Sequence, residues 1–132
     1  MGIQIHRLRV LGLVLLVGCQ SPMLVLPGKA LQGEVQQVES FAFAAGFDFL
    51  VLETRSEQPY SVNLRVTVIN GELYIDASPG RRWAQHLIES PICRIKLGDA
   101  LFEAVAIEVT DPNIKNRFLS QRRIYRMEPW RN

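Results

Sequence analysis

An alternating stretch followed by a tight-turn signal constrains the fold more than any other part of the sequence. From Tyr60 to Ile69, apolar side chains occupy every second position, and polar ones such as Asn63 lie between them. This two-residue period predicts a β-strand with one buried face and one solvent-facing side. Asn70-Gly71 follows directly, and both residues tolerate the positive φ of a two-residue hairpin turn. We therefore predict an antiparallel hairpin whose return strand runs from Glu72 to Ala77.

Other segments carry weaker signals of the same kind. Branched and aromatic residues predict three more strands, at residues 47–54, 92–97 and 100–110. Helical spacing predicts a helix from Arg81 to Ser90, and Asp111-Pro112 has the capping residue and the proline of a second helix start. Residues 34–46 fit either a helix or a strand.

These elements indicate one mainly β domain with helices (α+β). The 132 residues of the chain allow little more than one domain. We expect about five to six antiparallel strands and two to three helices. A small antiparallel sheet hides its edges best by closing on itself, so we predict a split β-barrel.

The first residues have the pattern of an export signal. Arg7 and Arg9 precede a short apolar run, and Gly18 stands before Cys19. The run is about half of the roughly 20 residues that span a bilayer. Its end, Leu16-Val17-Gly18-Cys19, resembles a bacterial lipobox. We predict a signal peptide at residues 1–18 and lipid on Cys19; an ordinary cleaved signal or a buried N-terminal element is the alternative.

The predicted lipid anchor implies a place in the cell. Residues 19–33 contain two prolines and two glycines without a sustained period, as in a tether that holds a domain away from a membrane. The barrel, with a C-terminal helix, is expected at residues 34–132. Gln20 after Cys19 favours the periplasmic face of the outer membrane if the host has two membranes. The predicted location is therefore the cell envelope.

Charge and cysteine content exclude several kinds of site. Without Arg7 and Arg9, the basic residues fall from 15 to 13, which equals the number of acidic residues, so no nucleic-acid partner is expected. With lipid on Cys19, Cys93 has no disulfide partner and is expected to be a buried, inert thiol. His86 is then the one remaining histidine, and no Cys/His cluster suggests a metal site.

The order of short motifs between residues 47 and 111 resembles that of a known group of proteins. The matching pieces are residues 49–55, 59–64, 70–75 and 77–78, followed by the basic pair Arg81-Arg82. Together they resemble the split β-barrel of the pyridoxamine-phosphate-oxidase-like superfamily of flavin proteins. Trp83, Leu87 and Pro91 have the spacing of its deazaflavin-dependent nitroreductase branch, although His86 replaces the asparagine that precedes the leucine there.

This resemblance implies a homodimer that binds FMN or a deazaflavin, a small-molecule ligand, between two barrels. On matching positions, the implied cofactor-binding residues are Arg55, Asn63, Ser78, Arg81, Arg82 and Trp83, with His86 as a weak candidate proton donor. Cations and hydroxyls at a helix start suit a phosphate. These candidates also have simpler explanations. Arg81 and Arg82 would be solvated at the surface, and Arg55 would pair with Glu53 or Glu57. Trp83 would pack in the core, and His86 would have a structural role. The absence of any cofactor is equally compatible with the sequence.

The C-terminal segment is strongly basic. Residues 115–131 carry six Lys and Arg and one acid. As a helix, the segment would either touch anionic lipid headgroups or dock on the barrel, and we favour docking.

Two functions remain open at this point. The first is a lipid-anchored flavin or deazaflavin protein that reduces a small acceptor, such as a quinone or a nitro compound. The second is a non-catalytic envelope lipoprotein that uses the barrel as a binding or interaction module.

Overall fold

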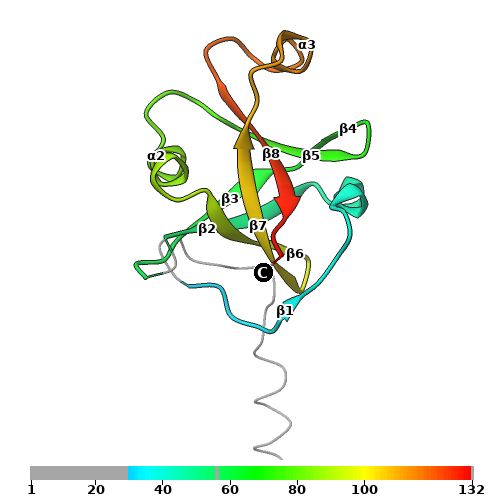
Figure 1. The fold of residues 1–132 in the computed structure, drawn as a ribbon, viewed down its shortest axis with the longest axis vertical. Coiled ribbons are helices and arrows are strands. Elements are labelled where there is room, and N and C mark those ends of the chain that lie inside the picture. The colour runs from blue at the N-terminus through cyan, green and yellow to red at the C-terminus, as the bar shows by residue number, and fades with distance from the viewer. Residues whose placement is uncertain (1–29, 56, 132) are drawn as a thin grey trace, which may run out of the picture.

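One curled sheet contains most of the described chain. The computed structural model describes residues 30–55 and 57–131 (Figure 1). The strands are β1 Val35–Gln36, β2 Phe49–Thr54, β3 Tyr60–Arg65, β4 Thr67–Ile69, β5 Glu72–Ala77, β6 Ile92–Leu97, β7 Ala100–Glu108 and β8 Arg123–Pro129. The helical elements are the 3-10 helix η2 Ala42–Gly46, α2 Arg82–Glu89 and α3 Pro112–Lys115. None of the described helices has the length and apolar character needed to cross a bilayer.

The sheet curls until its two ends meet. Its strand order is β3-β2-β6-β7-β8-β5-β4, and β1 adds a parallel pairing to β7. The first and last strands of this order are consecutive in sequence and are separated only by Val66, whose N–H donates to the Asp48 carbonyl at 2.9 Å. The single strand predicted from Tyr60 to Ile69 is therefore two strands. Because of this division, the alternating segment forms both edge strands of a mainly antiparallel split barrel, β3 at one edge and β4 at the other.

The hairpin and the core follow the sequence pattern closely. Asn70 and Gly71 have φ values of 52° and 78°, the left-handed conformation that the turn requires. Leu73 and Ile75 on the return strand are fully buried. The main core also contains Leu52 of β2, side chains from β6, β7 and β8, and one face of α2. In Figure 1, α2 lies beside the sheet and α3 lies beyond the end of β7.

One face of β7 packs in the main core, and the other is covered less completely. Phe102, Ala104 and Ala106 belong to this core, whereas Val105 and Ile107 are half-buried. β7 is a central strand, so both of its faces are at least partly covered and alternation is a weak guide to its orientation. Two alanines on the inner face leave room for the strongly curled sheet.

The predicted C-terminal helix is wrong. Asp111 does cap α3, since its side chain accepts a hydrogen bond from the Asn113 N–H at 2.9 Å, but the helix ends at Lys115. The chain then forms β8, which pairs with β7 on one side and β5 on the other. Backbone pairing on both edges outweighs the local helix signal, because the sheet would otherwise have two unpaired edges. This strand, β1 and the divided hairpin strand raise the count to eight, above the predicted five to six.

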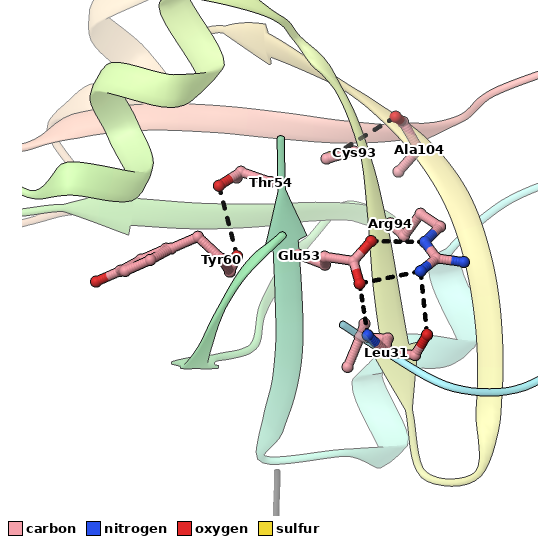
Figure 2. Close-up of polar contacts among 7 residues, drawn as sticks. All are labelled: Leu31, Glu53, Thr54, Tyr60, Cys93, Arg94 and Ala104. Atoms are coloured by element: carbon pink, nitrogen blue, oxygen red, sulfur yellow. Dashed lines mark hydrogen bonds and ion pairs between the residues drawn. The ribbon is translucent and has the colours of Figure 1, made fainter. Parts of the chain in front are cut away.

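A buried ion pair attaches the N-terminal segment to the barrel. Glu53 of β2 is 2% exposed and accepts two hydrogen bonds from Arg94 of β6, at 2.7 and 2.9 Å (Figure 2). The backbone of Leu31 completes the arrangement: its N–H donates to Glu53 and its carbonyl accepts from Arg94. Leu31 is thus part of the folded domain, although the predicted tether extends to Gly33. The predicted signal peptide and Cys19 lie outside the described residues.

Cys93 is buried, as predicted. Its side chain is 4% exposed, and its Sγ donates to the Ala104 carbonyl at 3.6 Å (Figure 2). Burial, with a smaller contribution from the charge of Glu53, raises the pKa of the Cys93 thiol to about 12. The reactive thiolate is therefore scarce at neutral pH.

The ion pair supports a stability prediction. Arg94→Met leaves the Glu53 carboxylate buried without its charged partner, which we expect to lower the free energy of unfolding by about 3–5 kcal/mol. Urea unfolding monitored by tryptophan fluorescence measures the change. Arg126→Met is the matched control, because Arg126 pairs with Glu128 at the surface at 3.5 Å and should cost less than about 1 kcal/mol. Equal losses in the two variants would contradict the role assigned to Arg94.

Candidate functional site

Five of the predicted cofactor-binding residues line one pocket of about 470 Å³. These residues are Asn63, Ser78, Arg81, Arg82 and Trp83. The pocket wall is formed by β3, the end of β5, the loop that follows β5 and the start of α2. Because the sheet curls, β3 lies opposite the end of β5, although the two strands are not neighbours in the sheet.

The loop before α2 gives the pocket a cationic edge. Gly80 has a φ of 82°, a conformation that glycine adopts without strain. Arg81 donates from Nε to Ser78 Oγ at 2.9 Å, and the Arg82 guanidinium lies 5.7 Å from the Tyr60 ring centroid. Within residues 30–55 and 57–131, neither of these arginines makes an ion pair.

The start of α2 adds to this positive potential. Arg81 occupies the N-cap position and makes no side-chain capping hydrogen bond. The first N–H groups of a helix have no partner within the helix, and the helix dipole places partial positive charge there. The loop and the helix start together can bind an anion.

Sequence reasoning missed an ion pair in the same pocket. Arg122 and Asp76 both line it, and Arg122 Nε pairs with Asp76 Oδ2. A second donor, Arg122 Nη2, lies 3.3 Å from the Asp76 carbonyl. No local pattern connects these residues; pairing of β5 with β8 brings them together, with Asp76 opposite Ile124. Tyr60 was assigned to a buried strand face, and it also lines the pocket.

Arg55 does not line this pocket. It has a φ of 55°, and its guanidinium donates to Gln58 Oε1 at 3.3 Å and to His86 Nε2 at 3.4 Å. The alternative of a pair with Glu53 is wrong, because that carboxylate binds Arg94.

His86 connects α2 to the β2–β3 hairpin. Its side chain is buried, and Nδ1 lies 2.7 Å from Thr54 Oγ1. The Thr54 hydroxyl donates to the Tyr60 carbonyl at 3.5 Å (Figure 2), so it accepts from a protonated Nδ1 and Nε2 accepts from Arg55. This arrangement requires a neutral ring. Burial lowers the pKa of His86, and the charge of Arg55 lowers it further. His86 therefore acts as a structural link and does not line the pocket.

Trp83 presents only a small part of its surface. The side chain is 3% exposed and packs at 6.1 Å, between ring centroids, against Tyr125 in the core. Its main contacts are those of a core residue, and a flat stacking surface for a cofactor ring is not available on it.

The environment of His86 predicts a pH effect on stability. Between its lowered folded pKa and the ordinary value of 6.5, the unfolded chain binds more protons. The free energy of unfolding should therefore fall as the pH drops below about 6.5. At pH 7.5, His86→Gln should lower the free energy of unfolding by roughly 1–2 kcal/mol, because the hydrogen bonds of His86 are lost. Between pH 7.5 and pH 5.5, the free energy of unfolding should then fall less in this variant than in the wild type. Urea unfolding at both pH values measures this. An unchanged pH dependence of the unfolding free energy in His86→Gln would refute the assignment.

Comparisons with known proteins identify the fold. No family model matches the chain, and no curated protein matches its sequence. A putative pyridoxamine 5'-phosphate oxidase from Listeria innocua superimposes with a TM-score of 0.58 at 14% identity, covering 68% of this chain and 90% of its own. General Stress Protein 26 from Bacillus anthracis superimposes with a TM-score of 0.56 at 19% identity, and the match covers 65% of this chain and 82% of that protein. HutZ, the heme storage protein from Vibrio cholerae, superimposes with a TM-score of 0.51 at 18% identity, and the match covers 68% of this chain and 87% of that protein. At such identities the likeness shows the fold alone: the described chain has the split β-barrel of the pyridoxamine-phosphate-oxidase-like proteins.

Proposed function

We propose that the domain binds the phosphate-bearing end of FMN or a deazaflavin in the 470 Å³ pocket. The observation that carries this proposal is the pair Arg81 and Arg82, which lacks ion-pair partners in the described chain and stands at the uncapped start of α2. Guanidinium groups beside backbone N–H groups are well suited to bind a phosphate. The split-barrel fold supports the same ligand class.

The rest of the pocket is compatible with a flavin-like ring system. A volume of about 470 Å³ lies within the range of small-molecule sites. Ser78 accepts from Arg81 and keeps its own hydroxyl proton for a ligand oxygen. Val62 and Leu64 offer apolar contacts, and Asn63 can donate to or accept from a ring. When bound, the cofactor would supply the hydride chemistry, and the protein would supply binding and orientation.

The same residues suit a phosphate better than a heme iron, the group named for HutZ. The described lining of the pocket contains no His, Cys or Met, and of the usual axial ligands of heme it offers only a tyrosine, Tyr60. The three arginines of the lining favour an anionic group. His86 has both ring nitrogens in hydrogen bonds elsewhere.

The proposal includes export, an anchor and a second copy of the chain. Lipid on Cys19 would hold the barrel at the cell envelope, on the periplasmic face of the outer membrane in a host with two membranes. A homodimer would supply a second wall for the pocket, with reduction of a small acceptor as the reaction.

A non-catalytic binding module is the second candidate. It is favoured by the positions of the groups most suited to proton transfer or nucleophilic attack. His86 is a neutral structural link, and Cys93 is buried with a raised pKa. Neither residue lines the pocket. Asp76, the acid in its described lining, is already paired with Arg122.

Flavin titration of the purified protein tests the proposal. Arg81→Ala with Arg82→Ala should weaken FMN binding at least about tenfold, since hydrogen bonds to charged groups contribute about 1.5–3 kcal/mol each. Riboflavin lacks the phosphate, so wild type should prefer FMN to riboflavin and the double variant should not. The control is Arg117→Ala, an exposed arginine away from the pocket. If folded wild type binds neither FMN, FAD nor a deazaflavin, the flavin proposal fails.

The anchor is tested separately. Cys19→Ser should move the protein from the membrane fraction to the soluble fraction, because one cysteine carries the lipid. Fractionation and labelling with a fatty-acid analogue measure the change. Cys93→Ser is the matched control and should stay in the membrane fraction with its label. Membrane retention of a fully folded Cys19→Ser variant would contradict lipid anchoring at this residue.

A further inference from the structure

A second, smaller pocket lies next to the first. It measures about 230 Å³ and shares Ala77, Ser78, Gly80 and Arg81 with the larger one. Its remaining wall comes from α2 and from the chain that enters β8. Arg81 is the one arginine that lines both pockets, so the two spaces meet at the loop between β5 and α2.

The polar groups around this smaller pocket are mostly hydrogen-bond donors. Arg81 and Arg123 line it, together with the amides of Gln85 and Gln121, and its described lining contains no acid. Gln121 has a φ of 65° where the chain turns into β8. Two guanidinium groups and two amide groups without a carboxylate favour an anionic ligand.

Arg123 is not firmly held by its acidic neighbour. Its Nε lies 3.7 Å from Glu108 Oε2, and the two side chains are 40% and 51% exposed. An ion pair of this length at the surface contributes little. Arg123 also has a side-chain hydrogen bond with Tyr125. A rearrangement of the guanidinium away from these two neighbours would let Arg123 bind an anion in the pocket beside Arg81, which has no ion pair in the described chain.

The first turn of α2 reinforces the same preference. Ala84 and Gln85 line the pocket and belong to this turn and the residue after it. Both pockets therefore lie close to the positive end of the helix.

We propose that the pocket formed by Arg81, Gln85, Gln121 and Arg123 is a second anion-binding site that takes a phosphate group. The phosphate belongs either to an extension of the ligand in the larger pocket or to a separate anionic molecule. The site goes beyond the proposed flavin function and does not require it, because inorganic phosphate alone is a sufficient probe.

Titration of the full chain with inorganic phosphate, monitored by amide NMR signals, tests the site directly. The backbone and side-chain amides of Gln85 and Gln121 should shift and saturate at phosphate concentrations up to ~10 mM, as expected for a weak small-anion site. Arg123→Gln should weaken this response at least tenfold. Gln85→Glu, which adds a negative charge from α2 without altering β8, should abolish the response at Gln121.

A control separates this site from its surroundings. Arg117→Gln removes a charge from the same basic segment, at a residue that lines neither pocket, and this variant should retain the response at Gln85 and Gln121. Absence of a saturable shift in folded wild type, or a response unchanged by both Arg123→Gln and Gln85→Glu, would overturn the proposal.

A competition experiment then assigns the source of the phosphate. FAD has a pyrophosphate and FMN a single phosphate. Displacement of inorganic phosphate from Gln85 and Gln121 by FAD, but not by FMN, assigns the site to an extension of the first ligand. Displacement by neither assigns it to a separate anion. If no flavin binds at all, the phosphate response still decides whether this site exists, so the two proposals can fail independently.

Discussion

Closure of the sheet at Val66 is the constraint on which the rest of the structure depends. A single residue joins the two terminal strands of the sheet, and its N–H is bonded to the Asp48 carbonyl. With the ends held there, β3 faces the end of β5 across the interior. The pocket lies between these two strands and the loop that follows β5. Without the closure, the polar residues on β3 and the arginines before α2 would have no common space.

The distribution of charge explains why the arginines before α2 are available to a ligand. Two acids of the sheet are paired with arginines from elsewhere in the chain: Glu53 binds Arg94 of β6, and Asp76 binds Arg122, which directly precedes β8. Arg81 and Arg82 are left without an ion pair in the described chain. His86, as a neutral link between the last turn of α2 and Thr54, attaches this helix to β2 and adds no charge of its own to the site.

The hairpin and helix in the middle of the chain were predicted from the sequence, whereas the C-terminal strand was not. The hairpin at Asn70-Gly71 and the helix now defined as Arg82–Glu89 depend on neighbours along the chain, and both are present. The C-terminal strand was missed because Ile124 and Tyr125 are both buried in succession. A central strand covered on both faces has no clear alternation, and the preceding Asp111-Pro112 helix signal, although correct, extends over only one turn.

The sequence by itself determined the local chemistry: a turn with Ser78 and Gly80, two arginines at a helix start, and a strand that presents Asn63 beside apolar residues. Only the tertiary structure decided which of these residues meet. It placed Arg55 with His86 outside the pocket, and it brought Arg122 to Asp76 from 46 positions away. The reason is physical: turns and caps depend on interactions among adjacent residues, whereas strand order depends on backbone pairing across the whole sheet, which no short segment encodes.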